Sequence, residues 1–489
     1  MRVLFVVADL YFGEPIGVMA LSAICRREGH AVRLIALRSH DIPETLDEFL
    51  PDFVAYSTMS PDEKRFAQGD GQVRAWAART GRRVVRVMGG PHPTFFPEVM
   101  ARLELDAICI GEGDLAIIRM LEAMEEKRDF VGIPNIMVPG SPELIKEVVE
   151  DLDALPFPDR AIFYQAAPEL QRSGMRSFMT QKGCPFKCTY CFNHTYNQMF
   201  KGVGRNLFRR RSVENVLAEI KHAREHFPDI RFIRFQDDSF AWRQDDPWLE
   251  EFAERYSREI GIPFYCLIRA DVINDTIGRQ LQKAGCWSVG MSLEAGNEQL
   301  RDVVLKREMS DAKIREGFGI ARKYGLRITS NTMLGIPGTT LEEDFNSVRV
   351  ARSLRITANQ FVIFAPYPRT ELTDYAQQLG VLDKEYDFSE LSPYGLTMLN
   401  SYTPREKMIQ RNLAFLGSII CKAPESLVPF LLRIVRINIP NFYSFVGTFY
   451  ISYVLSSQIF PGIRPQGVMH LFRAVVRTFA FYLAKPSRS

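Results

Sequence analysis

The first 140 residues alternate short apolar runs with segments in which apolar residues recur every three to four positions. The short runs have the length and composition of buried strands, and the spacing of the other segments is typical of helices. We expect strands at 2–9, 31–37, 53–58, 84–90 and 107–111, with helices at 17–28, 62–78, 97–103 and 115–127. Buried strands joined by helical crossovers predict a parallel, doubly wound α/β sheet, here a Rossmann-like domain over residues 1–145.

A second series of the same kind covers residues 171–385, after a linker at 146–170 that contains a proline-rich stretch at 155–160. Its strands are expected at 176–181, 231–238, 263–270, 287–296, 327–338 and 359–368, and its helices at 213–225, 248–259, 312–323 and 341–353. Six consecutive βα units predict a barrel or partial (β/α)6 barrel with its chemistry at the carboxyl ends of the strands. Residues 386–489 become mainly helical in pattern.

Small and polar residues follow the strands of the first series. In doubly wound sheets ligands lie beyond the carboxyl ends of the strands, and glycine lets the backbone approach a ligand closely. The candidate ligand-binding residues are Ser57, Thr58, Met59, Gly89, Gly90, His92, Gly111, Glu112 and Gly113. These positions are equally typical of ordinary turns between strands and helices.

The composition is that of a globular protein, with 46% hydrophobic and 24% charged residues in 489, so disordered, collagen-like and coiled-coil classes are excluded. Eight cysteines are too few for a disulfide scaffold. The N-terminal segment reaches Asp9 before a long apolar core forms, which is a poor signal peptide and a good first strand. We expect a cytoplasmic protein with reduced thiols available as metal ligands.

The C-terminal 64 residues differ from the rest in charge. From Ser426 to Ser489 there are six Arg, one Lys and no Asp or Glu, so this tail carries +7 and the preceding chain −4 of the net +3. Arg433 and Arg436 form an i, i+3 pair, and Arg473 and Arg477 an i, i+4 pair. Three interpretations stay open: a buried helical cap, a membrane-spanning helix, or an amphipathic surface that contacts the inner face of a membrane or admits a lipid-like substrate. Because the rest of the chain is slightly acidic, nucleic-acid binding is not expected.

Three cysteines, Cys184, Cys188 and Cys191, stand in C-x3-C-x2-C spacing just after the first strand of the second series. Thiolates converging from one short loop select an iron–sulfur cluster or zinc. With His194 the loop could also close a Cys3His zinc site. Three cysteines alone leave one iron of a 4Fe–4S cluster without a protein ligand.

This cysteine spacing, with Tyr190 before the last cysteine and a (β/α)6 pattern after it, resembles the radical S-adenosylmethionine (SAM) superfamily. The resemblance implies that SAM binds the open iron and yields a 5′-deoxyadenosyl radical. Tyr190 would pack on the adenine, Glu294 would bind the ribose, and Gly335 and Ile336 would support the adenine. Asp237 and Asp238 stand where many members carry a GGE motif for the methionyl amino group, and Arg269 would meet the SAM carboxylate.

The pairing of this barrel with a Rossmann-like domain resembles the cobalamin-binding radical SAM subgroup, which includes class B methyltransferases and anaerobic porphyrin cyclase-type proteins. The strand-end residues of the first domain would then contact cobalamin. The D-x-H-x-x-G signature that supplies a lower histidine ligand to cobalt is absent, so no residue is assigned to that role. His92 is interpreted as part of a nucleotide-tail loop or a helix-start turn.

The implied activity is methylation of an unactivated carbon in a small, hydrophobic or lipid-like substrate, with a flavodoxin or ferredoxin as reductant. Hydrogen abstraction makes such a carbon reactive, and methylcobalamin delivers the methyl group. A radical cyclisation or rearrangement without methyl transfer is the alternative within the subgroup. A cobalamin-responsive binding protein is the alternative from another class, and the open iron argues against it.

Overall fold

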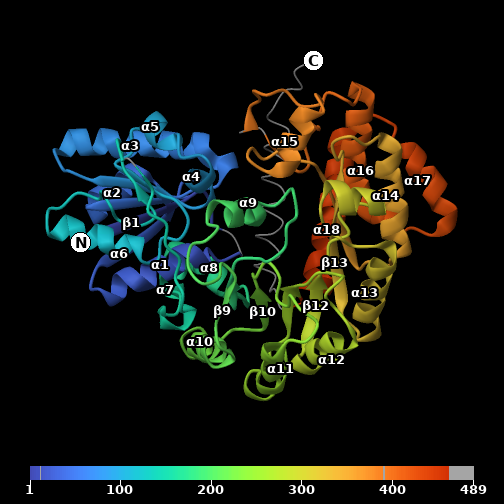
Figure 1. Ribbon diagram of the computed structural model, residues 1–489, viewed down its shortest axis with the longest axis horizontal. Helices are drawn as coiled ribbons and strands as arrows, with labels where there is room; N and C mark the ends of the chain where they lie inside the picture. Colours follow the sequence, from blue (N-terminus) through green and yellow to red (C-terminus); the bar gives the residue numbers. More distant parts are fainter. Residues whose placement is uncertain (11–12, 142, 389–390, 462–489) are drawn as a thin grey trace. The chain divides into compact units, whose positions relative to one another are not determined.

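The computed structural model describes residues 1–10, 13–141, 143–388 and 391–461. It divides into two compact units (Figure 1). The first unit comprises Met1–Gln171, Tyr196–Arg211 and Phe388, and the second comprises Arg172–Thr195, Ser212–Asp387 and the chain from Leu391. Residues 196–211 directly follow the cysteine loop in sequence, yet they pack with the first unit.

The first unit is built on a six-stranded sheet in the order β2-β1-β3-β4-β5-β6. Its strands are β1 (Arg2–Val7), β2 (Ala31–Ala36), β3 (Phe53–Ser57), β4 (Val85–Gly89), β5 (Ala107–Cys109) and β6 (Ile136–Met137). All neighbours pair in parallel except β6, which is antiparallel to β5. The order reverses between β1 and β3, and such a switch point is where ligands bind in doubly wound sheets.

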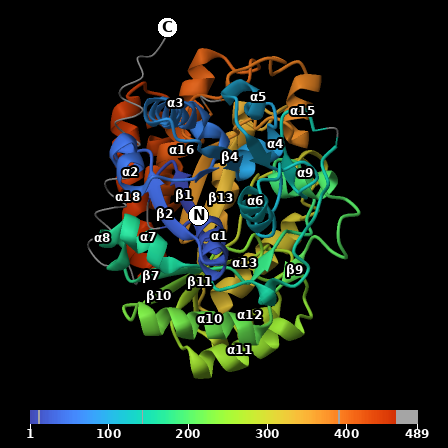
Figure 2. The same ribbon diagram turned by 90° about the vertical axis from the view of Figure 1, so that its left-hand side faces the viewer.

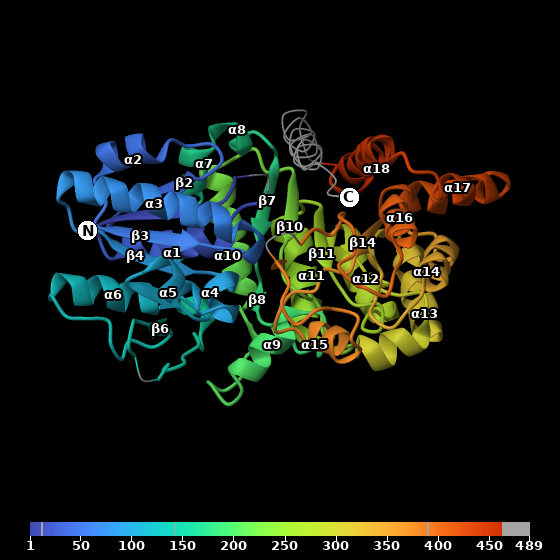
Figure 3. The ribbon, with the colours of Figure 1, turned by 90° about the horizontal axis from the view of Figure 1, so that it is seen from above.

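Helices cover this sheet on both faces, as the doubly wound pattern requires (Figure 3). They are α1 (Ile16–Arg27), α2 (Ile42–Phe49), α3 (Glu63–Thr80), α4 (Pro91–Phe95), α5 (Val99–Leu103), α6 (Ala116–Glu125), α7 (Arg160–Ala166) and α8 (Pro168–Gln171). Helix α2 packs beside α3, whereas α1 packs against α6 and α7. Residues 196–211, which follow the cysteine loop in sequence, add the short strand β9 (Arg209–Arg210) to this unit.

The second unit is built on a wholly parallel six-stranded sheet in the order β14-β13-β12-β11-β10-β7. Its strands are β7 (Met175–Phe178), β10 (Phe232–Phe235), β11 (Phe264–Leu267), β12 (Cys286–Gly290), β13 (Arg327–Leu334) and β14 (Ala358–Ile363), and the short β8 (Gln181–Lys182) follows β7. Each strand pairs with the next one in this series along the chain. Because β7 and β14 are both edges, this is a partial barrel, open on one side.

The helices of the second unit follow one another along the sheet, and α10, α11 and α12 lie side by side in Figure 2. They are α10 (Val213–His226), α11 (Pro247–Glu259), α12 (Asp275–Ala284), α13 (Asp311–Lys323), α14 (Leu341–Ser353) and α15 (Glu371–Gln378). Helix α9 (Phe192–Met199) begins in this unit, and its residues from Tyr196 on belong to the first unit. Side-chain caps fix several starts: Ser212 begins α10, Asp246 begins α11 and Ser310 begins α13. An apolar core joins α10, α11, α12, α13 and α14 to the sheet.

Three further helices, α16 (Pro404–Lys422), α17 (Val428–Ile434) and α18 (Pro440–Val454), end the described chain. Helix α16 packs on β14 and α14, and α18 packs on α16. A capping box between Thr403 and Glu406 starts α16. Within the described ranges, no helix is both long and apolar enough to cross a bilayer. Arg473 and Arg477, which the sequence pairs on one helix face, lie outside the described residues.

All eleven strands expected from the sequence are present, and the predicted fold class of two α/β units with a helical C-terminal region is confirmed. Two details differ. The sheet of the first unit is mixed, because the two-residue β6 is too short to give a period-two signal. The chain before 97–103 forms the additional helix α4, since Pro91 at its first turn has a backbone angle suited to a helix start.

Candidate cofactor-binding sites

The three motif cysteines lie at the carboxyl end of β7, between β8 and the start of α9. Their thiols are close enough to influence one another electrostatically. Burial raises the pKa of Cys184 to about 11 and that of Cys191 to about 12. Three neighbouring thiols from one loop are a donor set that fits an iron–sulfur cluster, and their deprotonation would accompany its binding. In the described ranges, no group of three His, Cys, Asp or Glu side chains is placed so that it could hold a single metal ion.

His194 does not join the cysteines as a fourth ligand. Its Nε2 atom lies 3.4 Å from Oε2 of Glu371 at the start of α15. The structure therefore gives the imidazole a carboxylate partner, and the Cys3His zinc arrangement that the spacing allowed is not formed.

Asp237 fixes the root of the cysteine loop. Its buried carboxylate accepts hydrogen bonds from the backbone N–H groups of Thr180 (2.7 Å) and Gln181 (3.0 Å) and from the Thr180 hydroxyl (3.1 Å). This aspartate therefore ties the end of β10 to the chain that leaves β7. The adjacent Asp238 is exposed. Desolvation raises the pKa of its carboxyl, and a hydrogen bond with Asn193 lowers the pKa by a smaller amount.

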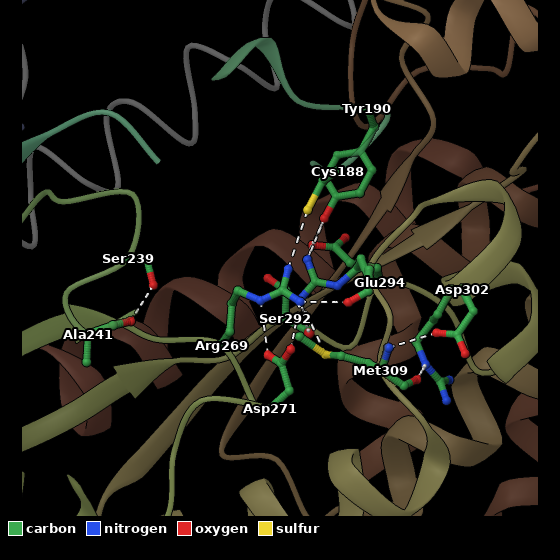
Figure 4. A network of polar contacts seen from close by, with 12 residues as sticks. Cys188, Tyr190, Ser239, Ala241, Arg269, Asp271, Ser292, Glu294, Asp302 and Met309 are labelled. Atoms are coloured by element: carbon green, nitrogen blue, oxygen red, sulfur yellow. Dashed lines mark hydrogen bonds and ion pairs between the residues drawn. The ribbon is translucent and has the colours of Figure 1, made fainter. Parts of the chain in front are cut away.

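Arg269 brings a positive charge to the cluster loop from the end of β11 (Figure 4). Its Nη1 atom lies 3.5 Å from the Sγ atom of Cys188, and its guanidinium carbon lies 3.9 Å from the centre of the Phe186 ring. Asp271 holds the guanidinium through two hydrogen bonds of 3.0 and 2.9 Å. Arg269 thus places a fixed cation beside the Cys188 sulfur.

Tyr190 and Glu294, which the resemblance assigns to the adenine and the ribose, contact each other (Figure 4), and Arg307 contacts both. The Tyr190 hydroxyl donates to Oε1 of Glu294 at 3.0 Å, and Nη1 of Arg307 donates to the Tyr190 hydroxyl at 2.5 Å. The same Nη1 lies 3.4 Å from the Glu294 carboxylate, and Nη2 donates to the Ser292 carbonyl at 3.2 Å. A charge with little solvent access is costly unless an opposite charge lies beside it. In this triad, Arg307 and Glu294 are buried and provide that partner for each other.

Sequence reasoning missed Arg307. It stands in the irregular segment after Leu300–Val304, where no motif marks it. Arg307 stands between the charged residues Lys306 and Glu308, 13 positions after Glu294, and nothing in this pattern distinguishes it from a surface arginine.

The loop after β13 holds Gly335 in a left-handed conformation, with φ of +67°. Its backbone N–H donates to Asp344 Oδ1 at 2.8 Å, and Gln410 from α16 donates to Oδ2 of the same carboxyl at 2.8 Å. Burial raises the pKa of Asp344 to about 7. Helices α14 and α16 thus fix the loop that contains Ile336.

In the first unit, the strand-end residues lie on the adjacent strands β3, β4 and β5. The Thr58 N–H donates to the Gly89 carbonyl at 3.0 Å, and the His92 N–H donates to the Thr58 carbonyl at 3.0 Å. Gly90 has φ of +92°, and a Cβ there would lie 3.0 Å from the Thr58 backbone. Ser57 ends β3 and Met59 is exposed. These loops leave small residues at one sheet edge, which fits the close approach of a large ligand.

The loop at Gly111–Gly113 is fixed by residues that follow the cysteines in sequence. Gly111 has φ of +90°, and a Cβ there would lie 2.4 Å from the Phe200 ring. Arg209 forms a salt bridge with Glu112 and donates to the Val149 carbonyl at 2.7 Å. The Glu112 carboxylate, expected to contact a cofactor, is thus held by Arg209 within the first unit.

His92 is buried at the start of α4. Its Nδ1 atom lies 3.1 Å from the Ser60 hydroxyl, and its Nε2 atom lies 3.4 Å from the Glu63 carboxylate. Burial, with a further effect of Arg102, lowers the pKa of His92 to about 4, so the ring is neutral. Both ring nitrogens therefore lie beside protein side chains at the turn where α4 starts.

Two family models match the two units. The model described as "B12 binding domain" matches residues 3–121, and the model described as "Radical SAM superfamily" matches residues 178–348. These matches cover the sheet edge of the first unit and the cysteine loop, triad and Gly335 loop of the second.

Among curated proteins, the chain is 26% identical over 378 residues to an uncharacterized methyltransferase of Pyrococcus horikoshii, which covers 74% of this chain and 78% of the relative. It is 24% identical over 382 residues to the hopanoid C-3 methylase of Methylococcus capsulatus, with 73% and 68% covered.

Two solved structures share the fold. The radical SAM methyltransferase TsrM from Kitasatospora setae, with cobalamin and a 4Fe–4S cluster bound, aligns with a TM-score of 0.68 at 14% identity over 98% of this chain and 99% of that one. The cobalamin-dependent SAM radical enzyme OxsB aligns with a TM-score of 0.64 at 14% identity over 99% and 80%. The prediction of 4Fe–4S, SAM and cobalamin as cofactors is confirmed, and the chain combines a B12-binding domain with a radical SAM domain.

Proposed function

We propose that this enzyme transfers a methyl group to an unactivated carbon of a small, hydrophobic, lipid-like substrate. The observation that carries the proposal is the combination of both cofactor domains in one chain with similarity to a hopanoid C-3 methylase. When bound, the cluster with SAM supplies hydrogen abstraction and cobalamin supplies a transferable methyl group.

We propose separate roles for the residues of the second unit. Cys184, Cys188 and Cys191 hold the cluster, and Arg269 offers a cation beside it for the SAM carboxylate. Glu294 binds the ribose hydroxyls through its second carboxylate oxygen, because the first is engaged by Tyr190. The backbone at Gly335 and Ile336 supports the adenine, and Asp238 remains available for the methionyl amino group.

In the first unit, we propose that the loops at Ser57–Met59, Gly89–Gly90 and Gly111–Gly113 contact cobalamin through their backbones. Glu112 and His92 act indirectly in this proposal, because their side chains already have protein partners that fix the loops. A small acidic electron carrier of the flavodoxin or ferredoxin class would supply the reductant. Because the proposed substrate is lipid-like, we also propose that the enzyme makes peripheral contact with a membrane.

The test is a turnover assay on the anaerobically reconstituted enzyme with SAM that carries a deuterated methyl group and a hopanoid as substrate. We expect a product that gains one labelled methyl group, with both 5′-deoxyadenosine and S-adenosylhomocysteine as co-products. A variant with the three cluster cysteines replaced by alanine is the control and should form neither product nor 5′-deoxyadenosine. Turnover that yields 5′-deoxyadenosine without S-adenosylhomocysteine would refute methyl transfer and favour a rearrangement.

A further inference from the structure

Helix α18 has two distinct faces. One face packs on α16 through Tyr443, Ser444 and Gly447, and Gly447 lies so close that a Cβ there would be 2.2 Å from the Phe415 carbonyl oxygen. The other face carries four aromatic side chains that are 54–60% exposed: Phe442, Phe445, Phe449 and Tyr453. Their spacing of three and four residues places them along one side of the helix. We call these four residues the aromatic stripe.

The preceding segment extends this apolar surface. Helix α17 and the residues on either side of it expose four further large apolar side chains: Leu427 before the helix, Phe430 on it, and Ile437 and Ile439 after it. Exposed apolar side chains thus occur on both α17 and α18, which are linked by a 3.0 Å hydrogen bond from the Tyr443 hydroxyl to the Ile434 carbonyl. Exposed aromatic residues gathered on adjacent elements mark an interaction site, whereas single ones need no explanation.

The described residues of α17, α18 and the turn between them carry two charged side chains, and both are arginines; Glu425, just before α17, forms a salt bridge with Arg352. Arg433 and Arg436 are exposed between the apolar residues of α17 and α18, and Lys422 is exposed at the end of α16. No Asp or Glu occurs from Ser426 to the end of the chain. Aromatic residues beside arginines, with no acidic residue on either helix, match a negatively charged, apolar partner.

We propose that α17 and α18 dock this enzyme on the surface of an anionic phospholipid bilayer. The stripe enters the boundary between headgroups and acyl chains, and the arginines contact the lipid phosphates. The helices lie along the surface, because no described helix is long and apolar enough to cross the membrane. The purpose of this docking, which is access to a lipid-like substrate, rests on the proposed function, whereas the docking itself does not.

The test is sedimentation of the full-length enzyme with vesicles of phosphatidylcholine and phosphatidylglycerol, and with vesicles of phosphatidylcholine alone. We expect the wild type to bind the anionic vesicles, with binding weakened by added salt. The variant Phe442→Ser/Phe445→Ser/Phe449→Ser should lose at least about ten-fold in partition coefficient, because it removes most of the inserted area. The matched control, Val131→Ser/Ile145→Ser/Leu396→Ser, replaces three similarly exposed apolar residues elsewhere and should bind like the wild type.

Two results would overturn the proposal. Unchanged vesicle binding by the stripe variant would assign the membrane contact to another surface. Dimers of the wild type in light scattering without vesicles, absent in the stripe variant, would assign the stripe to a second copy of this chain. Retained cobalamin and iron content shows that the variant is folded. Vesicle binding is measured without turnover, so failure of methyl transfer would leave this test unaffected.

Discussion

Replacing Arg307 by methionine removes the positive charge from the triad while keeping a long side chain. Glu294 would then be a buried carboxylate whose remaining partner in the triad is the neutral Tyr190 hydroxyl. The Ser292 carbonyl would also lose its 3.2 Å donor. Removal of one member of a buried ion pair costs about 3–5 kcal/mol of the free energy of unfolding.

The double variant Arg307→Met/Glu294→Gln separates charge from packing. It removes both charges and keeps a hydrogen-bonding partner for Tyr190, so we expect a loss of only about 1–2 kcal/mol. The double variant should therefore be about 1–4 kcal/mol more stable than Arg307→Met, and the single variant Glu294→Gln completes the cycle that gives the coupling energy of the pair. The control Arg315→Met removes an exposed arginine of α13 and should change stability by less than about 0.5 kcal/mol.

Urea unfolding of the cofactor-free enzyme, followed by tryptophan fluorescence, measures these free energies. Three of the four tryptophans, Trp242, Trp248 and Trp287, belong to the second unit, so the signal reports mainly on the unit that contains the triad. A loss below about 1 kcal/mol in Arg307→Met, or a double variant whose loss equals the sum of the single losses, would refute the charge-balance argument.

Three further outcomes are expected. Alanine at all three cluster cysteines should abolish iron uptake while cobalamin absorbance is retained; iron at wild-type levels would exclude these ligands. Gly111→Ala should weaken cobalamin binding and destabilise the first unit more than Gly132→Ala, because both glycines have positive φ but only the Cβ at Gly111 meets Phe200; equal effects in calorimetry would exclude the steric cause. The pKa of Asp344 is raised to about 7 in the folded protein, so the folded state binds more protons than the unfolded state. The free energy of unfolding should therefore fall as the pH rises from about 4 to about 7. Asp344→Asn should flatten this pH dependence, and an unchanged slope in urea titrations would contradict the assignment.

Much of this protein follows from local sequence. The periodicity of apolar residues located every long strand, because a buried parallel strand needs a continuous apolar run whatever its neighbours are. The cysteine spacing located the cluster loop for a similar reason, since three ligands to one cluster within a short loop must be close in sequence. The short β6 escaped detection because two residues carry no period.

The partners of the site residues were decided by the tertiary structure alone. Arg307 meets Tyr190 across 117 positions and Arg209 meets Glu112 across 97, so no local window contains both members of either pair. A buried charge needs a neutralising partner in space, and the chain satisfies that need with whichever residue the fold brings near. The sequence by itself thus determined the elements, the cysteine ligands and the family resemblance. Only the folded structure decided that Arg307 balances Glu294, that His194 turns to Glu371, and that residues after the cysteines hold the Gly111 loop.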